Sequence, residues 1–175
     1  MRDSYFGWIT AGLNAIGTAM IFGLLVLLNA DIIGRAAFNS PIAGVPELVA
    51  LSFVAIVFLQ LPHAVRLGRL TVADTLFARF ASAHPRAGCL LRALYNLIGA
   101  ITFAVVIYAS WPLFERAWTN KFFVGSLGTF TAPTWPTKLV ILIGAAAVTI
   151  QFLVLTATEI RGALGAGKGG EAGRK

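Results

Sequence analysis

Side chains able to do acid–base, metal or redox chemistry are few and scattered in this sequence. His63 and His84 are its only histidines, so a three-histidine metal site is excluded. The single cysteine, Cys89, excludes an intramolecular disulfide, a redox pair and a thiolate metal cage. The sequence contains neither a phosphate-binding Walker loop nor a Gly-x-Ser-x-Gly nucleophile elbow. We therefore expect a protein that is not an enzyme, with no catalytic residues, no metal and no cofactor.

The remaining charged residues near apolar segments stand at the ends of those segments. They are Asp31, Arg35, Glu47, Arg92, Glu115 and Glu159. An ionisable group in the middle of a membrane span would indicate a proton or ion pathway. The most polar residue deep in an apolar segment is Gln151, and a single amide more often joins helices than forms a site. The pattern favours a protein that packs against others over one that itself transports a substrate.

The elements that must position these residues are membrane helices. Apolar residues make up 58% of the chain and charged residues 12%. A soluble domain has about half and about a quarter, respectively. Four apolar segments are long enough to cross a hydrocarbon core of about 30 Å. We expect an all-α integral membrane protein with four transmembrane helices, near residues 8–33, 46–65, 89–114 and 135–158.

The distribution of basic residues predicts the orientation of the four helices. With four spans, ten of the 14 Lys and Arg residues fall on the side of the termini. By the positive-inside rule, both the N- and the C-terminus are expected in the cytoplasm of a bacterial inner-membrane protein. Because the net charge of +7 is spread around apolar spans, it indicates lipid headgroups rather than nucleic acid. Tryptophans near the predicted span ends agree with these boundaries: Trp8, Trp111, Trp118 and Trp135.

The connection between the first two predicted spans contains two candidate docking residues, Arg35 and Glu47. Pro46 suits the first helical turn, and Glu47 beside it compensates the helix dipole. Glu47 is also on the same predicted membrane side as Arg35. The sequence leaves open whether Glu47 only stabilises the helix start or also forms an ion pair with Arg35.

Small residues recur at every fourth position of the first predicted span and define what we call the small-residue seam. Its members are Ala11, Ala15, Ala19 and Gly23. Such spacing lets a second helix backbone approach closely in lipid. The seam serves either packing within this chain or contact with a partner protein. A Gly144–Ala147 patch in the fourth span predicts a further close-packing surface.

Three connecting or terminal segments carry further expectations. Residues 70–82 repeat apolar side chains at helical spacing, which predicts a short amphipathic interfacial helix or a connector packed on the protein. Residues 117–134 form an outside loop that docks a partner or lies on the membrane surface. The Gly- and Lys-rich residues 162–175 are expected to be a flexible cytoplasmic tail after a membrane domain over residues 1–161. The arginines expected to meet lipid headgroups are Arg66, Arg69, Arg79, Arg86 and Arg92.

The order of motifs from the first to the second span resembles the small membrane subunit of tripartite ATP-independent periplasmic (TRAP) transporters. In this sequence the motifs are Arg35, Phe38-Asn39-Ser40-Pro41, Glu47, Arg66-Leu67-Gly68-Arg69 and Val72-Ala73-Asp74. Three features depart from the family pattern: Asp74 falls one residue later than in the family's valine-aspartate pair, Pro46 stands where a second acidic residue is common, and the exit from the second span lacks the usual histidine.

The resemblance implies a four-helix subunit in a stable heterodimer with a large membrane subunit. That partner would hold the substrate and sodium sites, and a periplasmic substrate-binding protein would transiently dock and deliver an organic acid. The small subunit would be a fixed scaffold beside the moving domain of the large one.

Two alternatives of other classes remain open at this point. His63 and His84 are both predicted near one membrane face, which suggests a membrane anchor for a redox enzyme. The small-residue seam suggests a self-associating four-span channel.

Overall fold

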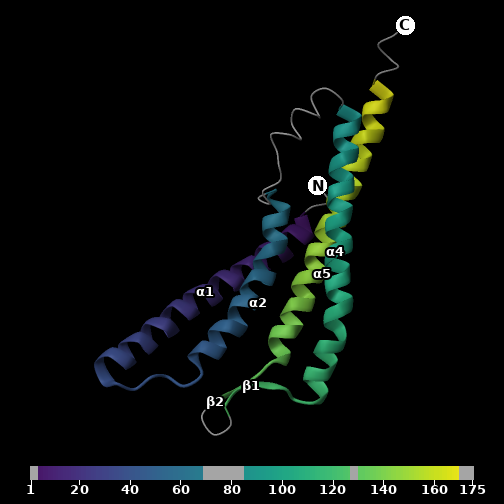
Figure 1. Ribbon diagram of the computed structural model, residues 1–175. Coiled ribbons are helices and arrows are strands. Elements are labelled where there is room, and N and C mark those ends of the chain that lie inside the picture. Colours follow the sequence, from purple (N-terminus) through teal and green to yellow (C-terminus); the bar gives the residue numbers. More distant parts are fainter. Residues whose placement is uncertain (1–3, 69–84, 127–129, 170–175) are drawn as a thin grey trace.

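The computed structural model describes residues 4–68, 85–126 and 130–169, and within them four long helices. These are α1 (Ser4–Phe38), α2 (Val45–Arg66), α4 (Pro85–Thr119) and α5 (Trp135–Gly169) (Figure 1). All four are long and apolar enough to cross a membrane. The expected all-α architecture with four spanning helices is therefore confirmed, whereas the expected interfacial helix at residues 70–82 lies outside the described residues.

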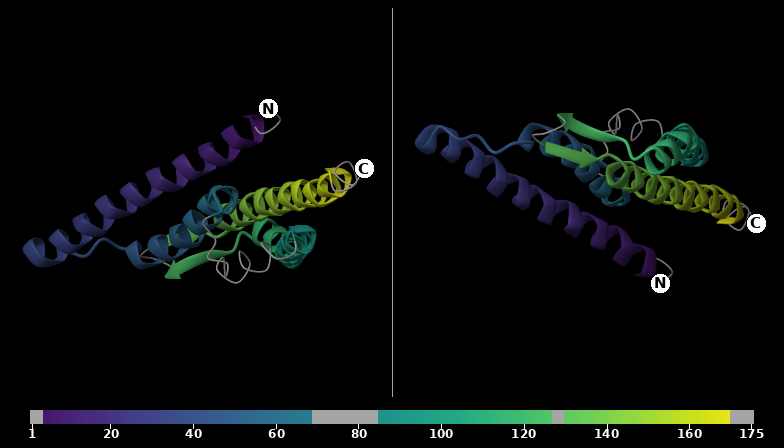
Figure 2. Two further views of the ribbon diagram at one scale, coloured as in Figure 1. Left: turned by 90° about the horizontal axis from the view of Figure 1, so that it is seen from above. Right: turned by 90° about the horizontal axis from the view of Figure 1, so that it is seen from below.

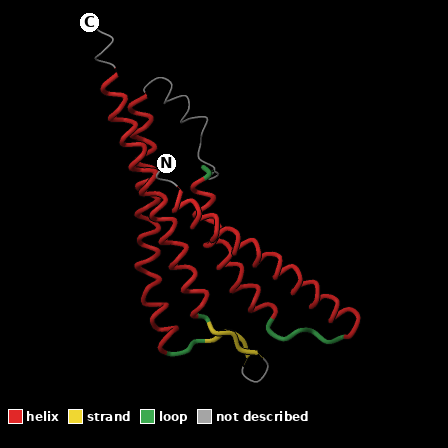
Figure 3. Tube along the Cα trace, turned by 180° about the vertical axis from the view of Figure 1, so that it is seen from behind, coloured by secondary structure: helices red, strands yellow, loops and turns green. Residues whose placement is uncertain are grey.

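The helices form two antiparallel pairs that meet through α2 and α5. α1 packs on α2, α4 packs along α5, and α2 joins the pairs by packing on α5. Both views of Figure 2 place α1 at the outside, away from α4 and α5. The first residues of α1 and the last of α5 lie at the same end of the bundle (Figures 1 and 3). We call this the terminal end, and the opposite end, with the α1–α2 connection, the loop end.

The centre of the bundle is built where α2, α4 and α5 meet. Its buried cluster comprises Val65, Ala100, Val148 and Phe152. The Phe152 ring stacks on that of Phe103 with centroids 6.1 Å apart. A Cβ at Gly99 of α4 would stand 2.9 Å from the tip of the Phe152 ring. Because residue 99 has no side chain, α5 can pack closely against α4 at this position.

At the crossing of α2 and α5, a glycine of α5 lies against the α2 backbone one turn before a proline. Pro62 lies inside α2 and is fully buried. Because proline has no N–H, the carbonyl of Phe58 one turn earlier lacks its usual helical donor. A Cβ at Gly144 of α5 would overlap that carbonyl oxygen. The sequence-based prediction that Gly144–Ala147 is a close-packing surface is confirmed at Gly144, where α2 is the partner, and Ala145 and Ala147 are also buried.

The connection from α4 to α5 contains an antiparallel hairpin, whereas the sequence predicts only a loop over residues 117–134. Strand β1 (Phe123–Ser126) pairs with β2 (Phe130–Pro133) at the loop end (Figure 3). α4 continues to Thr119 before the hairpin begins. The Trp118 and Trp135 rings meet edge to face, with centroids 5.0 Å apart, and close the base of this connection.

Helix α5 also extends farther than the sequence suggests. It continues to Gly169, into the segment expected to be a tail from residue 162, and residues 170–175 lie outside the described part. Four of residues 162–169 are glycines, which disfavour a helix, so the intrinsic helix propensity of this stretch does not predict the extension.

Candidate functional site

The loop end contains a buried carboxylate that holds the α1–α2 connection in place. The Asp31 side chain lies near the end of α1 and is only 7% exposed. Its Oδ2 accepts a hydrogen bond of 2.9 Å from Arg35 Nε and forms an ion pair with Arg35 Nη2 at 2.7 Å. Its Oδ1 accepts a bond of 2.8 Å from the backbone N–H of Ile42. Asp31 thus joins the last turns of α1 to the connection that leads into α2.

Backbone geometry turns the chain back immediately after α1. Asn39 adopts a left-handed conformation with φ of 49°, which asparagine tolerates better than most residues. The N–H of Ser40 then donates to the carbonyl of Gly34 at 3.1 Å. A Cβ at Gly34 would stand 2.9 Å from the Ser40 carbonyl oxygen, so glycine permits this close return.

The start of α2 is covered by the hairpin. Gly44 precedes the helix with φ of 83°, and its carbonyl accepts a hydrogen bond from Leu48 N–H. The ring of Phe130 lies directly against Gly44, in the space that a Cβ would need. Val45 and Ala132 are buried beside this contact. The α1–α2 connection and the hairpin therefore form one surface at the loop end, although they are far apart in sequence.

The structure pairs Arg35 with Asp31 and not with Glu47. The Arg35 side chain is 54% exposed, so one side of its guanidinium group is bound to Asp31 while the rest faces outward. Glu47 lies half-buried in the first turn of α2. The sequence leaves open whether Glu47 only stabilises the start of the helix or also pairs with Arg35. In the structure Glu47 lies at the helix start and does not pair with Arg35. The spacing of four residues between Asp31 and Arg35 is the signal in the sequence for the observed pair.

Removing the Asp31 carboxylate is expected to loosen the α1–α2 connection. In Asp31→Ala the Ile42 N–H loses its acceptor, and its hydrogen exchange should accelerate by about tenfold. Asp31→Asn keeps an acceptor oxygen and should accelerate exchange less. Hydrogen exchange of the detergent-purified chain measures this effect, with the Leu48 amide, bonded to Gly44, as the internal reference. Equal exchange of Ile42 in wild type and Asp31→Ala would show that Asp31 does not hold the connection.

The small-residue seam lies on a different face of α1 from the one that contacts α2. Gly17 meets α2, where a Cβ would stand 2.9 Å from Cγ of Gln60. In contrast, Ala15, Ala19 and Gly23 are exposed, and Ala11 is half-buried. A Cβ at Gly23 would meet nothing within 4 Å. Packing within the described chain therefore does not use the three exposed members of the seam.

The second half of α1 is largely uncovered by the other described helices. Figure 1 shows it running away from the other helices toward the loop end. Its exposed large apolar side chains are Ile21, Phe22, Leu25, Val26, Leu28, Ile32, Ile33 and Phe38. This surface faces lipid or another protein in the membrane.

The other residues singled out from the sequence are spread along the terminal half of the molecule. Arg66 ends α2, Arg92 lies in α4, and both are exposed. Arg69, Arg79 and His84 lie outside the described residues, as does the side chain of Arg86. His63 is half-buried in α2, and its Nδ1 is buried without a hydrogen-bond partner among the described residues. Within the described chain, no group of three His, Cys, Asp or Glu side chains is placed to hold a metal ion.

Comparison with known proteins gives one family. A model of the family described as "Tripartite ATP-independent periplasmic transporters, DctQ component" matches residues 24–162. The matched range contains the whole loop end, α2, α4, α5 as far as residue 162 and α1 from residue 24, but not Ala11, Ala15, Ala19 or Gly23. A comparison with curated proteins found no match.

Proposed function

Because the chain belongs to the family of the DctQ component of tripartite ATP-independent periplasmic transporters, a family of transporter components and not of enzymes, we propose that it is the accessory scaffold subunit of such a transporter. The family match over residues 24–162, in a chain with four spanning helices, carries the proposal. The chain is accordingly a multi-pass membrane protein of a TRAP system. In this role it widens the fixed part of the transporter and holds no substrate itself.

The proposed partners are a large membrane subunit, in a stable heterodimer, and a periplasmic substrate-binding protein that docks transiently. The large subunit carries the transport sites, and transport is driven by sodium and imports an organic acid. Uptake by proteoliposomes that contain both membrane subunits and the binding protein tests this part. Uptake that is independent of a sodium gradient would contradict sodium coupling.

We place the loop end in the periplasm and both termini in the cytoplasm. The excess of basic residues on the terminal side supports this orientation. In this orientation the exposed part of the Arg35 guanidinium group, Glu47 and the hairpin face the binding protein. Asp31 and Phe130 favour such a role because they hold the exposed groups on a defined surface. A preformed surface loses less conformational entropy on docking.

The heterodimer contact is proposed to lie on α1. The exposed seam residues support this proposal, since small side chains let a partner helix approach closely. Large exposed apolar residues beside the seam supply the surrounding contact. Packing against a large partner would also cover the second half of α1, which the other described helices leave exposed.

Enlarging the seam is expected to weaken the heterodimer. In the variant Ala15→Leu with Ala19→Leu, two leucines would hold the partner helix away from the α1 backbone. Recovery of the large subunit with a C-terminally tagged chain from mild detergent should fall by about tenfold or more.

The matched control enlarges two exposed alanines on another helix, Ala104→Leu with Ala109→Leu in α4. This control should retain the large subunit. If the α1 variant retains the partner as well as wild type does, the contact is not on the seam. If the wild-type chain purifies alone as a homo-oligomer, the accessory-subunit proposal itself is contradicted.

A further inference from the structure

The face of α1 that points away from α2 carries a regular pattern, which we call the α1 stripe. Its members are all exposed and alternate at spacings of four and three residues: Gly12, Ala15, Ala19, Phe22, Val26, Asn29 and Ile33. A Cβ at Gly12 would meet nothing within 4 Å. This alternation averages 3.5 residues, the repeat that keeps one face of a helix against a neighbouring helix in a left-handed coiled coil.

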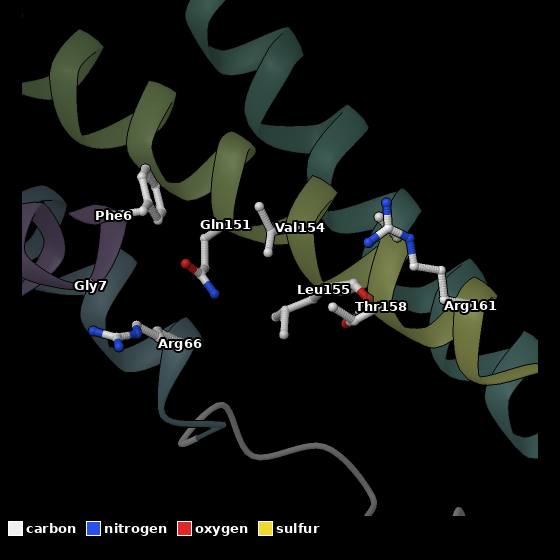
Figure 4. Close-up of a pocket in the computed structure, with 9 residues that line it drawn as sticks. Phe6, Gly7, Arg66, Gln151, Val154, Leu155, Thr158 and Arg161 are labelled. Atoms are coloured by element: carbon white, nitrogen blue, oxygen red, sulfur yellow. Dashed lines mark hydrogen bonds between the residues drawn. The ribbon is translucent and has the colours of Figure 1, made fainter. Parts of the chain in front are cut away.

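The opposite face of α1 is in contact with the rest of this chain. Gly7 lies against the Arg66 guanidinium group, and Gly17 lies against Gln60. Figure 4 shows Phe6 and Gly7 near Arg66, beside a cavity of about 510 Å³ between α1, α2 and α5. Gly17 is two residues from the nearest stripe members on either side, which places it on the other side of the helix. Contacts within the described chain therefore leave the α1 stripe free.

The length of the α1 stripe indicates what kind of element fits it. From Gly12 to Ile33 it extends about 32 Å along the helix, and a hydrocarbon core is about 30 Å thick. All of it lies within the spanning part of α1, Phe6–Phe38. An element that follows the stripe over this length is itself a spanning helix, which a soluble binding protein does not supply.

Asn29 is the polar member of the α1 stripe and favours a protein over lipid as the neighbour. Its Nδ2 donates to the Leu25 carbonyl at 2.7 Å. The side-chain carbonyl and the second N–H have no partner among the described residues. Ile32, Ile33 and Phe38 are exposed and continue the apolar surface beyond Asn29 toward the loop end. Lipid chains offer an amide no partner at this level, whereas a polar side chain on a neighbouring helix does.

We propose that one spanning helix of the large membrane subunit packs along the α1 stripe and that a polar side chain of this helix hydrogen-bonds to Asn29. The inference rests on the proposed function, which supplies a second membrane subunit, and it adds the face and the register of the contact. The glycine and alanines nearest the terminal end bring the two helix backbones closest there. Toward the loop end the stripe is mostly large and apolar, and a single polar pair fixes how far the helices are shifted along each other.

Photo-crosslinking of the tagged full-length chain in native membranes tests the face. Benzoylphenylalanine is placed at residue 22 or 26, on the stripe, and as a control at residue 21 or 28, which are exposed on a neighbouring face of the same helix. Because adjacent residues of a helix point about 100° apart, adducts with the large subunit should be several-fold more abundant from the stripe. Equal adducts from all four residues, or adducts that join two copies of this chain, would overturn the inference.

Two variants of Asn29 test the hydrogen bond. Asn29→Leu removes the amide without loss of size, and leucine favours a helix more than asparagine does. Recovery of the large subunit should fall by about three- to 30-fold, the range for one interhelical hydrogen bond in lipid. Asn29→Gln keeps an amide and should restore part of the association. The matched control is Thr102→Val in α4, because Thr102 is exposed and also bonds a carbonyl one turn earlier, that of Ile98; it should behave as wild type does.

The outcomes separate this inference from the proposed function. Unchanged recovery with Asn29→Leu would overturn the inference. Loss of the partner in Ala15→Leu with Ala19→Leu would then show that the heterodimer still forms through α1. If the wild-type chain neither crosslinks to nor co-purifies with a second membrane protein, the proposed function itself fails, and this inference fails with it.

Discussion

Replacing Gly144 by leucine is expected to separate α5 from α2 and to destabilise the bundle strongly. The Phe58 carbonyl of α2 occupies the space that a side chain at residue 144 would need. A backbone atom cannot move aside by changing rotamer, so the helices must shift. Overpacking of this kind costs about 3 kcal/mol, which corresponds to a fall in Tm of roughly 6–12 °C for a chain of this size.

Thermal unfolding of the detergent-purified chain, followed by tryptophan fluorescence, measures the effect. Gly12→Leu is the matched control, because Gly12 also lies in a spanning helix but a Cβ there would meet nothing within 4 Å. Gly12→Leu should leave Tm nearly unchanged. Equal Tm values for the two variants would mean that α2 and α5 do not meet at residue 144.

The expected loss also bears on the proposed scaffold. α2 joins α1 to the pair formed by α4 and α5, so a shift at Gly144 moves the proposed partner surface relative to the hairpin. A scaffold that must present two surfaces at once requires this crossing to be rigid. Gly144→Leu should therefore reduce recovery of the large subunit although it changes no exposed residue of α1.

The spanning helices are predictable because lipid imposes a simple rule on sequence. A span needs about 20 apolar residues whose backbone groups are all hydrogen-bonded. Individual residues at the ends of such a segment therefore indicate where the helix begins. Pro46 and Glu47 predict the start of α2 to within one residue of Val45, where it begins. The close-packing role of Gly144 is also predictable, although its partner is not.

The contacts at the loop end are harder to predict because they join segments far apart in sequence. Asp31 bonds the N–H of Ile42, and a backbone donor has no sequence signature. A shared membrane side suggests Glu47 as a partner for Arg35, whereas helical spacing places Asp31 closer. The hairpin cannot be predicted from the sequence because each strand has only four residues. A strand of this length is too short for a strong alternation of apolar and polar residues.

The contact of Gly44 with Phe130 leads to the second large expected effect. Gly44→Ala introduces a Cβ at a residue with φ of 83°, which costs about 1–2 kcal/mol. The same Cβ would overlap the Phe130 ring, which adds about 1–3 kcal/mol unless the hairpin moves. Thermal unfolding should show a fall in Tm, and hydrogen exchange should accelerate in β2.

Gly68→Ala separates the two causes of this loss. Gly68 also has a positive φ, of 64°, but a Cβ there would meet nothing within 4 Å. Gly68→Ala should therefore show the backbone cost alone and leave β2 unaffected. The double variant Gly44→Ala with Phe130→Ala should be less destabilised than the sum of its single variants, because the overlap is gone. Strict additivity would mean that the hairpin does not rest on the start of α2. In that case the loop end would not be one preformed surface, and the proposed docking of a binding protein there would lose its structural basis.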